Sequence, residues 1–318
     1  MSASGGGKAI IAALLANLGI AITKFIAFLF SGSSSTLAES VHSLADTGNQ
    51  GLLLLGGRRA RKAADREHPF GYGRERYVYA FVVAIILFSV GGVFSIYEGV
   101  EKIQHPHPLE VPWLPILVLV VAIVLESFSL RTAIRESNHV RGKQSWVEFV
   151  RRAKAPELPV VLLEDIAALT GLVFALLGVG ITILTGDPTW DGIGTLAIGV
   201  LLIAVAVILG IETKSLLVGE GATAADDRAI RTAITAHPEV QSLIHAKTLY
   251  LGPDELLVAA KIGLAPSSTL RDVSAVIDSI EYDIRAAVPV ARVIYLEPDI
   301  VRDGPSPATD AIVIKGAD

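Results

Sequence analysis

The stretch "TLAIGVLLIAVAVILG" (residues 195–210) decides the fold class, because neither Asp nor Glu interrupts it. A second run, "AFVVAIILFSVGGVF" (residues 80–94), has the same character. Of the 318 residues, 52% are hydrophobic and only 19% are charged, whereas about a quarter of a soluble domain is charged. The sequence therefore predicts an α-helical membrane protein.

Working outward from these runs, six stretches are long enough to cross a bilayer, which takes about 20 residues per helix. They are residues 9–31, 34–57, 77–102, 112–134, 157–185 and 189–216. The second is the most polar, so its assignment rests on its length and its neighbours. We interpret the first as a retained helix, because no small-residue cleavage site follows a short apolar core.

Lys and Arg concentrate in two of the short loops, between the second and third spans and between the fourth and fifth spans. The loops on the opposite side contain none. Because basic loops stay on the cytoplasmic side, we expect both termini to face the cytoplasm and the protein to lie in the cell (plasma) membrane. The alternative, that the basic loops bind nucleic acid, is not favoured because they lie directly against spans.

The sequence changes in character after about Gly219. A helix (223–240), two strands (242–252 and 255–265), a second helix (268–289) and a last strand (291–298) are predicted. This αββαβ order favours a small ferredoxin-like α+β domain. We therefore expect a six-helix transmembrane domain (1–218), a cytoplasmic α+β domain (219–300) and a flexible tail (301–318).

Polar residues interrupt the second span, "STLAESVHSLADTGNQGLLLL" (residues 35–55). His42 and Asp46 are four residues apart and share a helix face with Asn49. Such a stripe must face the bundle interior or a water cavity, because lipid cannot solvate it. Imidazole and carboxylate are ligands suited to a divalent ion such as Zn²⁺. A hydrogen-bonded structural pair is the other interpretation.

The fifth span supplies a second polar element, because "LLEDIAALTG" (residues 162–171) contains Glu164 and Asp165. Two adjacent buried acids without partners are costly. The second and fifth spans run antiparallel, and both polar elements lie near mid-membrane. We therefore predict a metal site formed by His42, Asp46, Asp165 and Glu164.

Two alternatives compete with the interpretation of this cluster as a site for a mobile metal ion. Lys24, in the first span, can pair with these acids and make the cluster structural, or it can pair with Glu98 or Glu126. A membrane metalloenzyme is the second alternative, but His42 lacks a second His on its helix and an adjacent Glu to act as base. The chain also has no cysteine, which excludes thiolate metal sites and cysteine nucleophiles. We predict that the protein is not an enzyme.

Several motifs together resemble the cation diffusion facilitator family of divalent-metal/proton antiporters. They are "ANLGIAITKFIAFLFSGSSSTLAESVHSLADTGNQ" (16–50), "ADREHPFGYGRER" (64–76), "LLEDIAALTG", "DPTWDGIGTLAIG" (187–199) and "VIYLEP" (293–298). The segments "HSLADTGNQ" and "HPFGYGRERYVY", together with the "ED" of the fifth span, resemble the branch that contains the eukaryotic zinc transporter nine.

The resemblance implies export of a divalent metal, Zn²⁺ in the first place, in exchange for protons by alternating access. The metal is then a transported substrate, and no prosthetic group is expected. The expected partners are metal ions, protons, the lipid bilayer and a second copy in a homodimer, without nucleic acid. The alternatives are transport of Mn²⁺, Fe²⁺ or Co²⁺ through the same site, or a metal-binding membrane scaffold.

Carried over by position, the family's span-two ligands fall on His42 and Asp46, and the second span-five ligand falls on Asp165. The first span-five ligand falls on Val161, which cannot bind metal. Glu164, Asn49 or water remain as candidates for the fourth position. The family's loop site falls on Asp65, His68 and Tyr72, where we favour a loop cap. In the last strand Tyr295 replaces the usual His, so we expect reduced regulatory metal sites.

Overall fold

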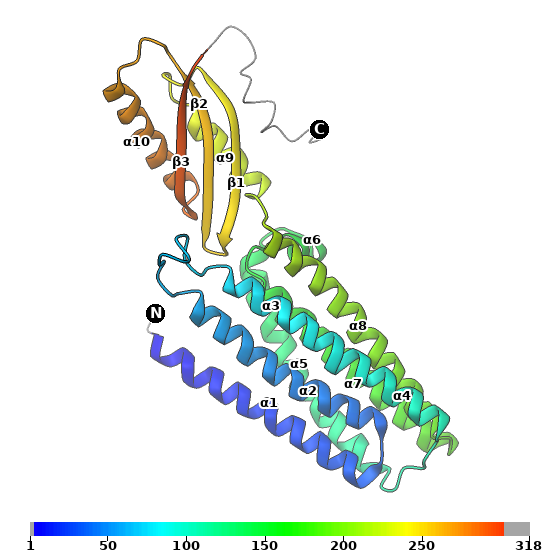
Figure 1. Ribbon diagram of the computed structural model, residues 1–318. Coiled ribbons are helices and arrows are strands. Elements are labelled where there is room, and N and C mark those ends of the chain that lie inside the picture. The colour runs from blue at the N-terminus through cyan, green and yellow to red at the C-terminus, as the bar shows by residue number, and fades with distance from the viewer. Residues whose placement is uncertain (1–2, 302–318) are drawn as a thin grey trace. The chain divides into compact units, whose positions relative to one another are not determined.

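The computed structural model describes the backbone of residues 3–301 and the side chains of residues 17–301 (Figure 1). Apart from its first residue, the predicted flexible tail lies outside this range. The chain divides into two compact units. One contains the chain up to Arg59 together with Glu75–Lys214, and the other contains Ala60–Arg74 and the chain from Ser215 onward.

Long helices build the first unit, and within residues 3–301 six long helical segments follow the predicted order. They are α1 (Ala3–Ser31), α2 (Ser34–Arg59), α3 (Glu75–Ile86) continued through the π-helix η1 (Leu87–Val93) into α4 (Phe94–Gln104), α5 (Trp113–Arg141), α7 (Glu157–Thr185) and α8 (Thr189–Val218). The short helix α6 (Trp146–Arg152) precedes α7.

The helix that contains the fourth predicted span continues beyond the span. Its apolar run stops near residue 134, but α5 continues to Arg141 and ends where Gly142 adopts φ +58°. A glycine tolerates this left-handed conformation, so it ends the helix where polarity alone does not. Gly186, with φ +72°, ends α7 in the same way.

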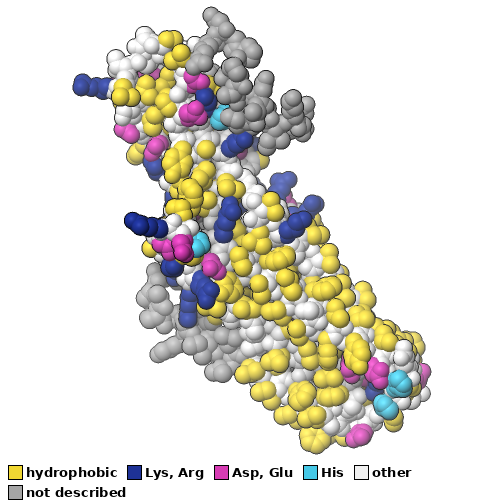
Figure 2. Space-filling view, in the orientation of Figure 1, with side chains coloured by type: hydrophobic (Ala, Val, Ile, Leu, Met, Phe, Trp, Pro, Cys, Tyr) yellow, Lys and Arg dark blue, Asp and Glu magenta, His cyan; other side chains and the backbone are white. Residues whose placement is uncertain are grey.

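Within the part of the chain that the structure describes, four helical segments are long and apolar enough to cross a membrane, namely Glu75–Gln104, Trp113–Arg141, Glu157–Thr185 and Thr189–Val218. Asn17–Ser31 is a shorter apolar helix within the described residues. α2 is less apolar than these because of its polar stripe. Hydrophobic side chains cover the visible face of the bundle in Figure 2, as expected of a surface that contacts lipid.

Glycines set how closely the helices of the bundle approach one another. A Cβ atom on Gly199 of α8 would lie 2.8 Å from the backbone nitrogen of Ile96 in α4. A Cβ on Gly99 of α4 would lie 2.9 Å from the carbonyl oxygen of Gly192. Small residues allow such backbone contacts between membrane helices, so α4 and α8 pack directly against each other.

The second unit carries a three-stranded sheet with order β1-β2-β3, formed by β1 (Ser242–Gly252), β2 (Glu255–Leu264) and β3 (Ala291–Ile300). β1 pairs antiparallel with β2, and β2 pairs parallel with β3. Helices α9 (Ala224–Thr235) and α10 (Leu270–Ala287) contribute to one core with the sheet, including Ile234, Ile280 and Val258. The predicted fold class, a six-helix membrane bundle with an αββαβ domain, is confirmed.

The loop Ala60–Arg74, which joins α2 to α3, packs on the end of β1 in the second unit. A Cβ atom on Gly73 would lie 2.7 Å from the carbonyl oxygen of Leu251, and one on Gly252 would lie 2.8 Å from the Cα atom of Gly73. The two backbones therefore touch at a point where only glycine leaves enough room.

Candidate metal-binding site

His42 and Asp46 lie where the spacing predicts, on one face of α2. The Nε2 atom of His42 is 3.4 Å from Oδ2 of Asp46, and their side chains are 1% and 15% exposed. Among the described residues, three atoms of this pair have no hydrogen-bond partner: both imidazole nitrogens of His42 and Oδ1 of Asp46. Buried polar atoms are usually satisfied, so this pair has bonding capacity left for a ligand. His245 in β1 also has both imidazole nitrogens without a hydrogen-bond partner among the described residues.

Glu164 and Asp165 point in different directions from α7, as adjacent helical residues about 100° apart must. Oε1 of Glu164 accepts a hydrogen bond from Nδ2 of Asn49 at 2.8 Å, so this carboxylate faces α2. Oδ2 of Asp165 accepts from the hydroxyl of Ser129 at 3.0 Å, so this carboxylate faces α5. Both acids are buried.

The structure brings the four predicted ligands into one region without closing them around one point. Among the described residues, no three His, Asp or Glu side chains are arranged to hold a metal ion. The negative charges of Glu164, Glu126 and Asp165 nevertheless act on Asp46. Two of these acids are held by hydrogen bonds from Asn49 and Ser129.

Lys24 pairs with an acid that the sequence analysis did not assign to it. Its ammonium group donates to Oε2 of Glu39 at 3.1 Å and to the hydroxyl of Ser43 at 2.7 Å. Lys24 and Glu39 are both 0% exposed. The lysine therefore forms hydrogen bonds to α2 beside His42, and not to the predicted ligands, Glu98 or Glu126. The sequence signal for this pair was the presence of one lysine in the first span and one glutamate, Glu39, in the next span.

Asp191 fixes the start of α2. Its carboxylate accepts from the backbone nitrogen of Ser34 at 2.8 Å and of Ser35 at 3.2 Å, and from the hydroxyl of Ser33 at 3.0 Å. A carboxylate at a helix N-terminus satisfies free N–H groups and the helix dipole. The motif "DPTWDGIGTLAIG" thus anchors the helix that carries His42 and Asp46 to α8.

The π-helix η1 lies against the same region and was not predicted. A Cβ atom on Gly91 would lie 3.9 Å from Nδ1 of His42 and 3.1 Å from the side chain of Leu202. A π segment inside an α-helix frequently marks a functional site. The pair Gly91–Gly92 was the available sequence signal, because these residues leave space for His42 and for α8.

The loop residues Asp65, His68 and Tyr72 form a closed polar cluster. Oδ1 of Asp65 accepts from the backbone nitrogen of His68 at 2.8 Å, and Oδ2 accepts from Tyr72 at 2.7 Å and from Lys62 at 3.0 Å. These hydrogen bonds, first among them that from Tyr72, hold the pKa of Asp65 well below its usual range. The arrangement is that of a loop cap, with both carboxylate oxygens already occupied.

Three residues considered for regulatory metal binding lie on different segments of the second unit, namely His237, His245 and Tyr295. His237 pairs with Asp283, with Nε2 3.0 Å from Oδ2. His245 lies in β1, and Tyr295 of β3 is 59% exposed. Tyr295 thus occupies a surface position on the sheet.

Comparison with known proteins gives a match over most of the chain. The model of the cation efflux transmembrane domain matches residues 10–218. Similar proteins include the mitochondrial proton-coupled zinc antiporter SLC30A9 of Xenopus laevis, 32% identical over 265 residues, which are 82% of this chain and 47% of the relative. The human protein of that name is 31% identical over 260 residues, which are 81% of this chain and 46% of the relative.

Metal tolerance protein C4 of Arabidopsis thaliana is 30% identical over 257 residues, which are 80% of this chain and 56% of the relative. The chain spans about half the length of these relatives. The matched domain defines a family of transporters rather than enzymes. The chain therefore belongs to the cation diffusion facilitator family of cation efflux transporters, in the branch of the zinc transporter nine-like proteins.

Proposed function

We propose that this protein exports a divalent metal ion, Zn²⁺ in the first place, in exchange for protons. The observation that carries the proposal is the buried His42–Asp46 pair, whose nitrogens and Oδ1 lack hydrogen-bond partners among the described residues. One imidazole with carboxylates is a ligand set that suits Zn²⁺. Relatives named as proton-coupled zinc antiporters support the same ion and the same coupling.

His42, Asp46 and Asp165 are the proposed ligands, with Glu164 as the fourth. Metal binding then exchanges the hydrogen bonds from Asn49 and Ser129 for bonds to the ion. A turn of α7 relative to α2 brings its carboxylates toward His42. Such a turn is the kind of rearrangement that alternating access requires, and it makes ion binding and helix position depend on each other.

Proton coupling follows from the chemistry of the ligands. Imidazole and carboxylate bind metal only when deprotonated, so metal and protons compete for one site. Protons arriving from outside displace the ion in the outward-open state, and the protonated site returns inward. Histidine titrates close to neutral pH in water, which suits His42 to this exchange.

Topology and assembly complete the proposal. We assign residues 1–218 to the transport domain and residues 219–300 to a cytoplasmic domain that holds a homodimer. The basic loops support an orientation with both termini in the cytoplasm, and we assign the protein to the cell membrane. The zinc antiporters of similar sequence are mitochondrial, so cell fractionation with an organelle marker decides between these two locations.

Reconstituted vesicles test the function. We expect Zn²⁺ uptake with opposite proton movement, both lost in Asp165→Ala, while Asp187→Ala in the α7–α8 turn behaves as wild type. Flux without proton movement would indicate a channel, and no flux in correctly folded protein would indicate a scaffold. Competition by Mn²⁺, Fe²⁺ and Co²⁺ ranks the metals. If Asn49→Ala impairs transport and Glu164→Ala does not, the fourth ligand is misassigned.

A further inference from the structure

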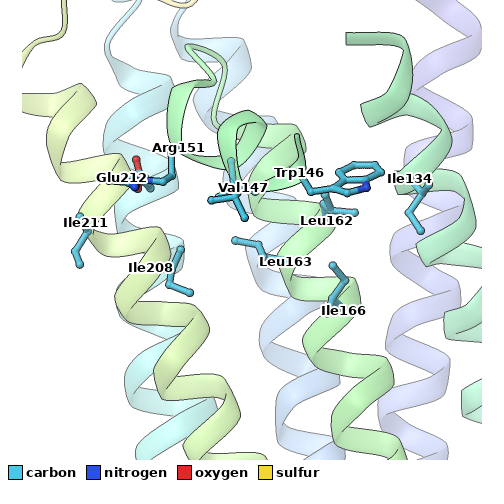
Figure 3. Close-up of a pocket in the computed structure, with 11 residues that line it drawn as sticks. Ile134, Trp146, Val147, Arg151, Leu162, Leu163, Ile166, Ile208, Ile211 and Glu212 are labelled. Carbon is cyan, nitrogen blue, oxygen red and sulfur yellow. The ribbon is translucent and has the colours of Figure 1, made fainter. Parts of the chain in front are cut away.

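A cleft of about 800 Å³ opens on the helical unit (Figure 3). Its walls come from α5, α6, α7 and α8, and its lining includes Trp146, Val147, Leu163, Ile166, Ile208 and Ile211. This volume lies within the range of about 300–1,000 Å³ that is typical of sites for small-molecule ligands. The cleft is therefore large enough for part of an organic ligand.

The cleft faces outward from the bundle and not into its core. Val147 and Ile211, which line it, remain 69% and 60% exposed. Ile166 lies roughly 14 Å along α7 from Glu157, at 1.5 Å per residue, and thus within the apolar part of the span. At that depth the surrounding medium is lipid and not water, which favours an occupant with a hydrocarbon chain.

Charge is confined to one end of the cleft. Figure 3 shows Arg151 and Glu212 directed toward each other above Ile208 and Leu163. Nε of Arg151 is 3.7 Å from Oε1 of Glu212, too long for a hydrogen bond, and the arginine side chain is 72% exposed. Arg141 lies over the ring of Trp146 at 4.2 Å. Arg141 does not itself line the cleft, and Figure 3 shows Trp146 on the other side of the cleft from Arg151 and Glu212. Arg151 is therefore the cationic residue that lines the cleft beside Glu212.

We propose that this cleft binds an anionic phospholipid, with an acyl chain along Leu163, Ile166 and Ile208 and the phosphate at Arg151. An apolar groove with a largely exposed arginine at one end is complementary to an amphiphile with an anionic head. Basic pockets between membrane helices recognise lipid headgroups in this way, and each buried methylene adds favourable transfer energy.

The lipid contacts the same turn of α7 that carries the acidic residues. Leu163 and Ile166 line the cleft, and they flank Glu164 and Asp165 in the sequence. Occupancy of the cleft therefore restrains rotation of this turn. This consequence rests on the proposed transport function, whereas lipid binding itself does not.

Fluorescence quenching tests lipid binding without any transport measurement. The chain contains three tryptophans, so a Trp113→Phe/Trp190→Phe variant reports on Trp146 alone. In bilayers, we expect phosphatidylglycerol brominated on its acyl chain to quench Trp146 more strongly than brominated phosphatidylcholine at equal mole fraction. Equal quenching by the two lipids would overturn the proposal, because the cleft would then hold bulk lipid only.

Matched arginine variants locate the headgroup. Arg151→Gln should weaken the phosphatidylglycerol preference about fivefold, the effect of about one cationic contact with an anionic lipid. Arg152→Gln should leave it unchanged, because Arg152 pairs with Glu148 at 2.7 Å instead. An equal loss in both variants would show general surface attraction and overturn the specific site.

A substitution that fills the cleft with a larger side chain gives an independent check if Arg151→Gln folds poorly. Ile208→Phe should abolish the lipid preference while Arg151 remains in place, and retention of the preference would contradict the proposal. A second copy of the chain is the competing occupant. Val147→Cys, in a chain that otherwise has no cysteine, would then form a disulfide between copies, while neither brominated lipid quenched Trp146.

Discussion

Two His–Asp pairs at short sequence spacing lie in opposite environments. One is His42 with Asp46 in α2, and the other is His68 with Asp65 in the loop between α2 and α3. The first pair is largely buried, and both imidazole nitrogens of His42 lack a hydrogen-bond partner among the described residues. The Asp65 side chain is 39% exposed, yet its two carboxylate oxygens already accept hydrogen bonds from Tyr72, Lys62 and backbone donors. Residue type alone does not distinguish the two pairs; they differ in burial and in how much hydrogen-bonding capacity is left for a ligand.

The largest expected effect separates these two aspartates. Asp46→Asn should reduce proton-coupled Zn²⁺ flux in vesicles to background, because it removes a charged ligand without changing size. Asp65→Asn should retain flux close to wild type, because the hydrogen bonds of Asp65 are made to residues of its own loop. Loss of flux in both variants, or in neither, would break the comparison.

The pair of Lys24 and Glu39 adds a third case to the comparison, because it is as buried as His42 but forms a hydrogen-bonded ion pair. Lys24→Met should destabilise the protein by about 3–5 kcal/mol, since it leaves Glu39 as an uncompensated buried charge. The double variant Lys24→Met/Glu39→Leu should recover most of that loss. Thermal unfolding in detergent measures both. Asp46→Asn should show no comparable loss of stability, and a similar loss there would assign His42–Asp46 a structural role.

The smallest effect is the response of the loop to pH. The hydrogen bond from Tyr72, followed by those from the His68 backbone and Lys62, lowers the pKa of Asp65. A group with a lowered folded-state pKa stabilises the fold above its ordinary pKa and loses that contribution as pH falls through the lowered value. The loop should therefore stay ordered throughout the near-neutral pH range.

Carboxyl NMR of Asp65 measures this directly. Tyr72→Phe removes the largest cause and should raise the pKa of Asp65 toward its ordinary value. Lys62→Gln is a matched control that leaves the Tyr72 hydrogen bond in place and should give a smaller rise. In the wild type, the backbone amides of this loop should be protected from hydrogen exchange near neutral pH. Rapid exchange there would contradict the assignment of a stable loop cap.

The sequence predicts those features that depend on periodicity and polarity along one element. The six long helices and the αββαβ order follow from apolar runs and turn residues, and the His42–Asp46 face follows from helical spacing. The bond from Asn49 to Glu164 and the pair of Lys24 and Glu39 depend on how two helices are rotated against each other. That rotation is set by packing across the bundle, as at Gly199 and Ile96, and no single stretch of sequence encodes it.

The π-helix η1 has a consequence for how the third span can move. A π turn accommodates an extra residue within a helix, and one residue corresponds to about 100° of rotation. Conversion of η1 to regular α-helix would therefore rotate α4 about its own axis while α3 stayed in place. Because Gly91 borders His42 and Gly92 borders Ile203 of α8, such a change of register would alter the wall beside the imidazole without tilting a whole helix.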